Sequence, residues 1–158
     1  MISMICSVGK KLELGKNNQL IWHIPKDMKF FKETTMGHPV VMGKNTYLSL
    51  PGDLPGREMI VLSSNKINGN VETVDNIQVI LDRYLNSSSE VFIIGGASIY
   101  AQFIDYAKIL YLTEINDICD DADTFFPKVD MNEWDREVLD TGRYKDIDFE
   151  MCKYTRKD

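Results

Sequence analysis

The chain has 158 residues, of which 44% are hydrophobic and 27% charged, and its formal net charge is −6 at pH 7. That length predicts a single domain, residues 1–158, with a full hydrophobic core, and the negative charge argues against a broad surface for nucleic acid or an anionic membrane. The three cysteines are widely spaced, which argues against disulfides or a zinc site and suits a reducing, cytoplasmic compartment. No apolar run approaches the length of a transmembrane helix.

Predicted strands and helices alternate along the first half of the chain. Apolar runs predict buried strands over residues 2–8, 39–42 and 59–62. A long loop over residues 9–21 follows the first strand, and we interpret it as a lid because it leads directly into the next helix. That helix is expected to begin at Pro25, a residue suited to the first helical position.

The second half continues this alternation and ends in an antiparallel pair of strands. We predict a helix over residues 77–85 and strands over residues 91–94, 109–115, 134–139 and 149–154. A turn around Thr141-Gly142 is expected to join the last two strands, and the acidic stretch 117–123 is expected to be a solvated loop. The alternation predicts a mostly parallel sheet covered on both faces, with ligands at the carboxyl ends of its strands.

A single acid interrupts the apolar side of the helix that begins at Pro25. At about 100° per residue, Asp27 lies in the same arc as Met28 and Phe31. An acid in the first turn of a helix is often explained by the helix dipole alone. Alternatively, Asp27 lines a cavity walled by Met28, Phe31 and Trp22, where it would bind a ligand group that offers two N–H bonds side by side. The segment by itself favours neither interpretation.

Three predicted strands end in residues that suit an anion: Gly43-Lys44, Ser63-Ser64 and Gly95-Gly96. Glycines between a strand and a helix let the backbone approach a phosphate, although each turn alone is weak evidence. Together they suggest a long, multiply phosphorylated ligand such as a dinucleotide. Because His23 and His38 are far apart and no catalytic triad is evident, an enzyme of this kind would rely on its cofactor for the chemistry.

The chain resembles the dihydrofolate reductase family from Met1 to the last predicted strand. The segments that carry the resemblance are residues 14–18, 22–27, 41–47, 54–57, 62–64, 94–100, 111–113 and 123–127. Each segment is modest alone, but in this order and at these spacings the set is highly specific.

The resemblance implies an α/β fold with a mostly parallel central sheet of about eight strands, an antiparallel C-terminal strand and about four flanking helices. It also implies NADPH-dependent reduction of 7,8-dihydrofolate to 5,6,7,8-tetrahydrofolate by hydride transfer, which supplies one-carbon and thymidylate metabolism. The expected cofactor is NADPH, the expected partners are the small-molecule substrate and antifolate inhibitors, and the enzyme is expected to be a cytoplasmic monomer.

The resemblance assigns roles to individual residues. Asp27 would bind the amidine-like edge of the pterin, Thr113 would support that carboxylate, and Trp22 would lie on the mobile loop over the nicotinamide. Arg57 would bind the carboxylate of the glutamate tail. The other expected substrate-binding residues are Ile5, Ser7, Leu20, Met28, Phe31, Lys32, Leu50, Leu54, Ile94 and Tyr100. The expected cofactor-binding residues are Ser7, Gly15, Asn18, Leu20, Gly43, Lys44, Asn45, Thr46, Leu62, Ser63, Ser64, Asn65, Gly95, Gly96, Ala97, Ser98, Ile99, Tyr100 and Gln102, with a cis peptide typical of Gly95-Gly96 and no metal ligand.

The sequence departs from the family pattern at three positions. Ile21 replaces the proline that many members have before the tryptophan, and Ala122 replaces a glycine in the Asp-Gly-Asp-Thr segment. Ser98 stands where some members place a cation near the 2′-phosphate, so the discrimination against NADH would depend on Lys44 and on Ser63-Ser64.

Two alternative functions use the same residues. The phosphate-binding strand ends would also suit a nucleotide- or pterin-binding module without turnover. A related reductase acting on another heterocycle is the second alternative, and the combination of Asp27 with Arg57 argues against it because that pair suits a pterin with a glutamate tail.

Overall fold

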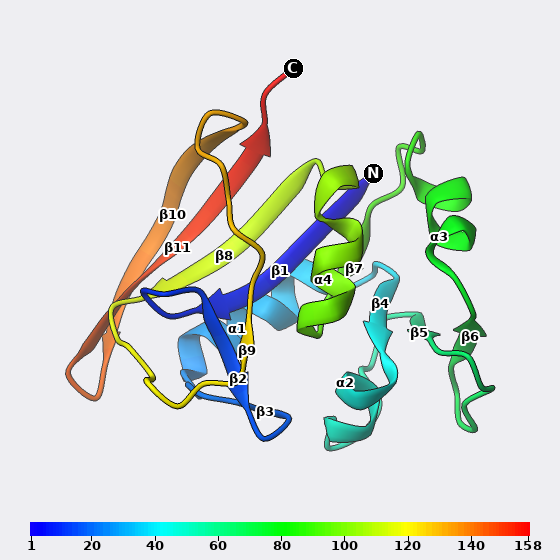
Figure 1. The fold of residues 1–158 in the computed structure, drawn as a ribbon, viewed down its shortest axis with the longest axis horizontal. Helices are drawn as coiled ribbons and strands as arrows, with labels where there is room; N and C mark the ends of the chain where they lie inside the picture. The colour runs from blue at the N-terminus through cyan, green and yellow to red at the C-terminus, as the bar shows by residue number, and fades with distance from the viewer.

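The computed structural model describes all residues 1–158 and places an eight-stranded sheet at the centre of the molecule (Figure 1). The strand order is β10-β11-β8-β1-β7-β4-β5-β6. These strands are β1 (Ile2–Val8), β4 (Val40–Gly43), β5 (Met59–Leu62), β6 (Glu72–Val74), β7 (Val91–Ile93), β8 (Ile109–Ile115), β10 (Trp134–Tyr144) and β11 (Ile147–Arg156). Neighbouring strands are parallel except at β11, which runs antiparallel to both β8 and β10. The predicted α/β sheet with an antiparallel C-terminal strand is confirmed.

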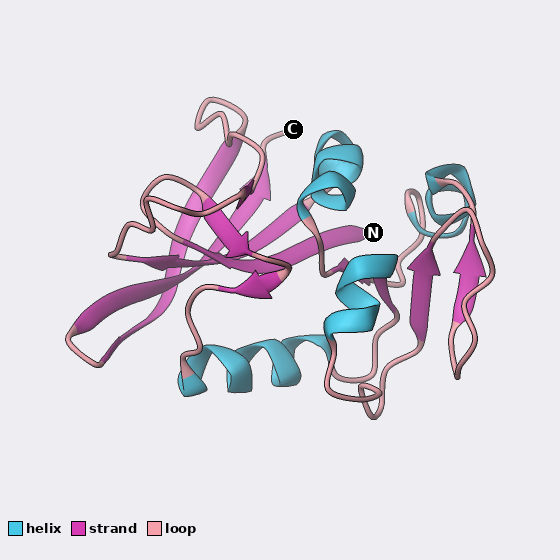
Figure 2. Cartoon of the chain, turned by 60° about the horizontal axis from the view of Figure 1, so that its bottom comes forward, coloured by secondary structure: helices cyan, strands magenta, loops and turns pink.

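Four α-helices cover the sheet, and they are α1 (Pro25–Thr35), α2 (Lys44–Ser49), α3 (Ile77–Tyr84) and α4 (Ala97–Phe103). In Figure 1, α4 lies in front of the sheet and α1 lies behind it, and Figure 2 shows α1 along the underside. A 3₁₀ turn, Ile104–Tyr106, extends α4. None of the four helices has the length and apolarity needed to cross a bilayer.

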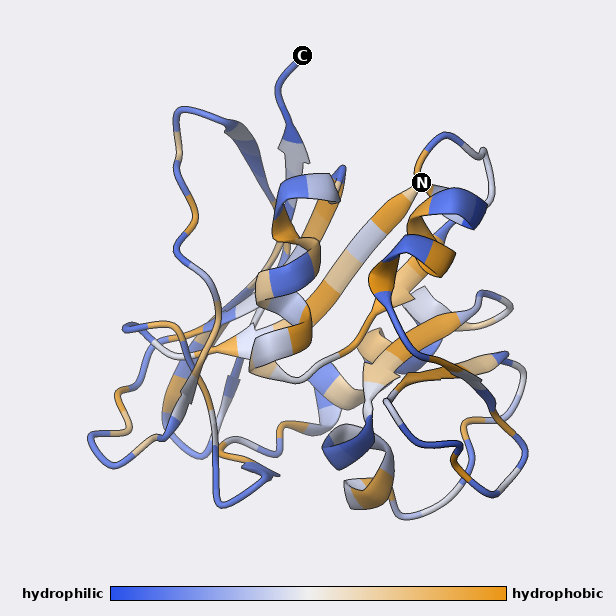
Figure 3. Ribbon diagram, turned by 45° about the vertical axis from the view of Figure 1, so that its right-hand side comes forward, coloured by the Kyte–Doolittle hydropathy of each residue, from blue (hydrophilic) through white to orange (hydrophobic).

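The central strands are largely apolar, and their ribbons are mostly orange in Figure 3. Successive residues of a strand point to opposite faces, so Met4 packs in the cluster that contains Phe103 of α4, whereas Ile5 packs in the cluster that Phe31 of α1 covers. Continuous apolar runs of this kind predict buried parallel strands. The same alternation decides which side chains of β1 and β8 face α1.

The loop predicted over residues 9–21 is wrong in part, because it contains a β-hairpin. β2 (Glu13–Lys16) pairs with β3 (Gln19–Leu20) and with β9 (Thr124–Phe125) in a small separate sheet. Asn17 and Asn18 adopt left-handed backbone angles, with φ of 52° and 61°, and asparagine pairs of this conformation suit two-residue hairpin turns. The strands are too short to show a clear alternation in the sequence.

The turn predicted around Thr141-Gly142 is also wrong. β10 and β11 continue beyond that point, and the turn lies at Lys145 and Asp146, whose φ angles are 48° and 65°. Gly142 is paired with Phe149 instead, and a Cβ atom at Gly142 would lie 2.4 Å from the Phe149 ring. The glycine makes room for an aromatic ring of the core rather than forming a turn.

The sequence does not predict β6, because a three-residue edge strand gives no periodic signal.

Candidate active site

Asp27 lies in the first turn of α1, and its side chain faces strand β8. The Thr113 hydroxyl of β8 donates a hydrogen bond to Asp27 Oδ1 at 2.5 Å. Thr113 is 2% exposed and Asp27 is half-buried, so this bond is partly shielded from solvent. Parallel pairing places Ser7 of β1 beside Thr113, and two hydroxyl groups therefore accompany the carboxylate. The predicted support of Asp27 by Thr113 agrees with this geometry.

Burial raises the pKa of the Asp27 carboxyl above its ordinary value, and hydrogen bonds from Thr113 and Ser7 oppose the rise. Asp27 makes no ion pair with a lysine or arginine. A partly desolvated carboxylate without a cation can bind an N–H-rich edge of a ligand strongly, because charge-assisted hydrogen bonds gain strength away from water. This favours the cavity interpretation of Asp27 over the helix dipole alone.

The expected apolar wall is assembled beside α1. One hydrophobic cluster contains Ile5, and Phe31, Leu50, Leu54 and Ile94 pack against it. These residues come from β1, α1, the segment after α2 and the position directly after β7, so only folding brings them together.

Two further apolar residues and one basic residue of the expected site are exposed. Met28 is 58% exposed and Leu20 is 57% exposed, and Lys32 is also exposed. Exposed apolar side chains are available to cover a bound ring. The sequence predicts that Met28 walls a closed cavity around Asp27, and this prediction is wrong because the Met28 side chain is exposed.

Arg57 is held in place by neutral acceptors. Its Nε donates to Pro55 O at 3.1 Å, and Nη1 donates to Thr35 Oγ1 at 3.2 Å. The Thr35 hydroxyl in turn donates to Phe31 O in α1. No carboxylate lies within ion-pair distance of Arg57, and burial lowers the pKa of its guanidinium. The guanidinium is thus oriented by α1 and retains the capacity to bind an external carboxylate.

Tyr100 is expected to bind both the substrate and the cofactor. It is buried in α4, and its hydroxyl donates to Ile5 O at 2.8 Å. This bond joins α4 to the strand that carries Ile5 and Ser7. Tyr100 therefore supports the site through β1.

Two glycine turns meet at the carboxyl ends of β4 and β7. The Gly43 N–H donates to Gly95 O at 2.9 Å, and the Gly95–Gly96 peptide is cis, as expected. A Cβ atom at Gly43 would lie 3.1 Å from Ile99, and one at Gly95 or Gly96 would lie 3.5 Å from the Thr46 hydroxyl. α2 and α4 begin here without side-chain caps. Their first N–H groups are therefore free to bind anionic oxygens, and the two turns fit the phosphates of a dinucleotide such as NADPH.

The third predicted strand end lines a hollow of about 490 Å³. Ser63 and Ser64 form one side of it, together with Lys66, which the sequence analysis did not include. The Asn65 N–H donates to Ser63 Oγ at 3.2 Å, which closes the turn after β5. Among the remaining expected cofactor residues, Lys44, Asn45, Ser98 and Gln102 are exposed, Leu62 and Ala97 are half-buried, and Gly15 is buried in the hairpin.

The acidic stretch 117–123, predicted to be a solvated loop, also binds two other segments of the chain. Asp117 Oδ2 accepts the indole N–H of Trp22 at 3.0 Å, and Asp123 Oδ2 accepts the backbone N–H of Asn17 at 2.9 Å. These bonds tie the hairpin and Trp22 to the loop before β9. The partners are 95 and 106 residues apart, so no local pattern could have revealed them.

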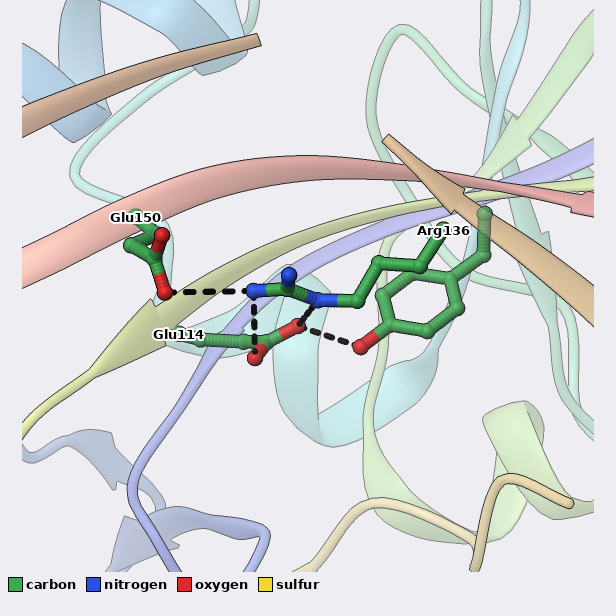
Figure 4. A network of polar contacts seen from close by, with 4 residues as sticks. Glu114, Arg136 and Glu150 are labelled. Atoms are coloured by element: carbon green, nitrogen blue, oxygen red, sulfur yellow. Dashed lines mark hydrogen bonds and ion pairs between the residues drawn. The ribbon is translucent and has the colours of Figure 1, made fainter. Parts of the chain in front are cut away.

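A polar network fixes β8 from the other face of the sheet (Figure 4). Arg136 of β10 donates to both oxygens of Glu114 at 3.2 and 3.3 Å and to Glu150 of β11 at 3.2 Å, and the Tyr154 hydroxyl also donates to Glu114. Glu114 follows Thr113 and points to the opposite face. A larger hollow of about 960 Å³ borders Glu114 and Tyr154 and contains none of the predicted site residues.

The comparisons with known proteins identify the family of the chain. The family model described as dihydrofolate reductase matches residues 1–156. The dihydrofolate reductase of Neisseria gonorrhoeae is 40% identical over 145 residues, covering 90% of this chain and 88% of that protein, and the Bacillus subtilis enzyme is 33% identical over 163 residues, covering 99% and 95%. A solved structure of Enterococcus faecalis dihydrofolate reductase complexed with NADP(H) and RAB-propyl superposes with a TM-score of 0.90 at 29% identity, covering 100% of this chain and 97% of the other. The chain belongs to the dihydrofolate reductase family.

Proposed function

We propose that this chain reduces 7,8-dihydrofolate to 5,6,7,8-tetrahydrofolate with NADPH, and that Asp27 is the residue that orients the pterin. The observation that carries the proposal is the partly desolvated Asp27 carboxylate, which accepts the Thr113 hydroxyl at 2.5 Å and makes no ion pair. The apolar wall and Arg57 lie on the same side of the sheet, where they match a substrate with a flat ring system at one end and a carboxylate at the other.

Each residue of the site has a distinct task in this reaction. NADPH, when bound, supplies the hydride. The Asp27 carboxylate accepts two N–H groups from the pterin edge, which fixes the ring and electrostatically favours a proton on the ring nitrogen. The apolar wall of Ile5 and Phe31 excludes water from the two rings, and Arg57 binds the tail carboxylate. Catalysis by this chain therefore depends on orientation and electrostatics, without a protein nucleophile.

The glycine turns after β4 and β7 would hold the phosphates of NADPH, since the first N–H groups of α2 and α4 follow these turns and the Thr46 hydroxyl lies beside Gly95 and Gly96. Lys44 and Ser63-Ser64 would bind the 2′-phosphate, because Ser98 carries no charge. Trp22 and Leu20 would cover the nicotinamide from the lid. Leu20 is exposed and would become covered when the rings are bound.

The proposal is tested by following nicotinamide absorbance after mixing the protein with dihydrofolate and NADPH, with NADH in a parallel reaction. We expect consumption of NADPH that requires dihydrofolate and is slower with NADH. Folded protein that binds NADPH but consumes no pterin would select the non-catalytic binding module. Turnover of a different heterocycle in place of dihydrofolate would select the related reductase.

We also propose that the 158 residues act as a single domain and that the chain is a cytoplasmic monomer. All three cysteines are free thiols, which suits a reducing compartment. Sedimentation should give the mass of one chain, 18.1 kDa, and unfolding should be a single transition. A dimer mass, or two separate transitions, would contradict this proposal.

A further inference from the structure

Glu13 is a buried carboxylate that the proposed chemistry does not use. It lies at the start of β2, is 1% exposed, and makes no ion pair. A buried charge is costly unless hydrogen bonds compensate it. Both oxygens of Glu13 are compensated by backbone N–H groups: Lys11 N donates to Oε1 at 2.6 Å, and Cys119 N donates to Oε2 at 2.7 Å.

The second of these bonds joins two separate parts of the chain. Glu13 belongs to the base of the lid hairpin, whereas Cys119 belongs to the loop before β9, 106 residues later. Burial alone would raise the pKa of the Glu13 carboxyl, but the N–H groups of Cys119 and Lys11 bring that pKa below its ordinary value. The carboxylate therefore stays ionised at neutral pH and keeps both bonds.

The same loop holds Trp22. Asp117, two residues before Cys119, accepts the Trp22 indole N–H at 3.0 Å, and its carbonyl accepts the Lys10 N–H at 2.9 Å. Glu13 also lies close to the indole itself, because a Cβ atom at Gly9 would lie 2.4 Å from the Trp22 ring and 2.6 Å from Glu13 Oε1. The carboxylate and the indole thus pack around one glycine.

We propose that Glu13 is a positioning residue for the reductase reaction: by accepting the Cys119 N–H, it holds the Asp117 loop against the lid base, so that Trp22 stays in place over the nicotinamide site. This inference rests on the proposed role of Trp22. In this proposal Glu13 acts through Asp117 and Trp22, and a direct contact with substrate or cofactor is not needed.

The test compares Glu13→Leu, which removes both acceptor oxygens, with Glu13→Gln, which keeps one. An amide has a single acceptor oxygen, so Gln can satisfy only one of the two N–H groups. The matched control is Glu137→Leu, at an exposed position of β10. Because removing an acceptor leaves a buried N–H group without a partner, a purely structural role predicts a lower melting temperature and no change in ligand release.

The first readout is independent of activity. The chain has two tryptophans, Trp22 and Trp134, so a nitrogen-15 spectrum shows two indole N–H signals. We expect the Trp22 signal to shift or broaden in both Glu13 variants and the Trp134 signal to remain unchanged. The second readout is NADPH release, which we expect to be about tenfold faster in Glu13→Leu, equivalent to about 1.4 kcal/mol of binding free energy, and less affected in Glu13→Gln. The KM for dihydrofolate should stay unchanged.

An unchanged Trp22 signal in a folded variant would overturn the proposal, and so would a shifted signal with normal NADPH release, because Glu13 would then be only structural. If Glu13→Leu does not fold, the same criteria apply to Glu13→Gln. Failure of the proposed function is recognised separately, because wild-type protein would then leave dihydrofolate unreduced while the indole spectra still report on Glu13.

Discussion

Replacing Asp27 with asparagine separates the catalytic role of the carboxylate from its effect on stability. Asparagine has nearly the same size, and its amide oxygen can still accept the Thr113 hydroxyl that now donates to Asp27 at 2.5 Å. This hydrogen bond is therefore kept, and it contributes nothing to the change in the free energy of unfolding. What disappears is the negative charge.

The sign of the stability change follows from the raised pKa of Asp27. Its ordinary value is 3.8, and burial raises the pKa in the folded protein. At pH below the unfolded value both states are protonated and wild type carries no penalty. As the pH rises through the folded pKa, the unfolded state ionises more readily, and the free energy of unfolding falls by at most about 1.36 kcal/mol per pH unit. Asparagine avoids this loss.

We therefore expect Asp27→Asn to match wild type in stability near pH 3.5 and to equal or exceed it at pH 7.5. A gain of 1 kcal/mol would raise the melting temperature by about 2–4 °C in a domain of this size. Turnover at neutral pH should fall by about 10²-fold or more, the usual cost of losing a group that assists proton transfer. Urea denaturation at the two pH values and steady-state turnover measure both effects, with Asp105→Asn as an exposed control.

A lower melting temperature at pH 7.5 together with normal turnover would refute this reasoning. A stability difference that is equally large at pH 3.5 would also contradict it, since the effect would then not come from ionisation. Loss of turnover with unchanged stability agrees with this reasoning. The hydrogen bonds from Thr113 and Ser7 oppose the effect of burial on the Asp27 pKa, so the gain in stability can be small.

Three further substitutions test other parts of the site. Arg57→Gln should raise the KM for dihydrofolate by about 10- to 100-fold, the worth of a charge-assisted pair of hydrogen bonds, while a dihydropterin without the glutamate tail is unaffected; equal changes for both substrates would exclude a tail clamp. Thr113→Val should raise the pKa of Asp27 further, because it removes a hydroxyl that lowers that pKa, and carbon-13 NMR of the Asp27 carboxyl measures the shift; a lower pKa would contradict the assigned hydrogen bond. Gly142→Ala should destabilise the protein by about 1–3 kcal/mol through overpacking, because its Cβ would lie 2.4 Å from the Phe149 ring; an unchanged urea midpoint would show that the strand adjusts without cost, and KM should not change in either case.

Local patterns predicted the strands and helices whose own residues carry the signal. The apolar runs of β1, β5 and β8 have the predicted bounds, and α1 begins at Pro25. Where an element depends on a partner, the predictions failed. The β2–β3 hairpin and β9 exist because they pair with each other, and β10 continues past Gly142 because Phe149 of β11 packs there.

By itself, the sequence determined that one acid lies on the apolar side of a helix and that glycines follow two buried strands, because these facts depend on spacing along a few residues. Only the tertiary structure decided what surrounds that acid. Thr113 reaches Asp27 from 86 residues away, Ser7 lies beside it through strand register, and Glu13 meets Cys119 across 106 residues. Such contacts depend on how strands pair and which face each residue takes, and a one-residue change of register would reverse them.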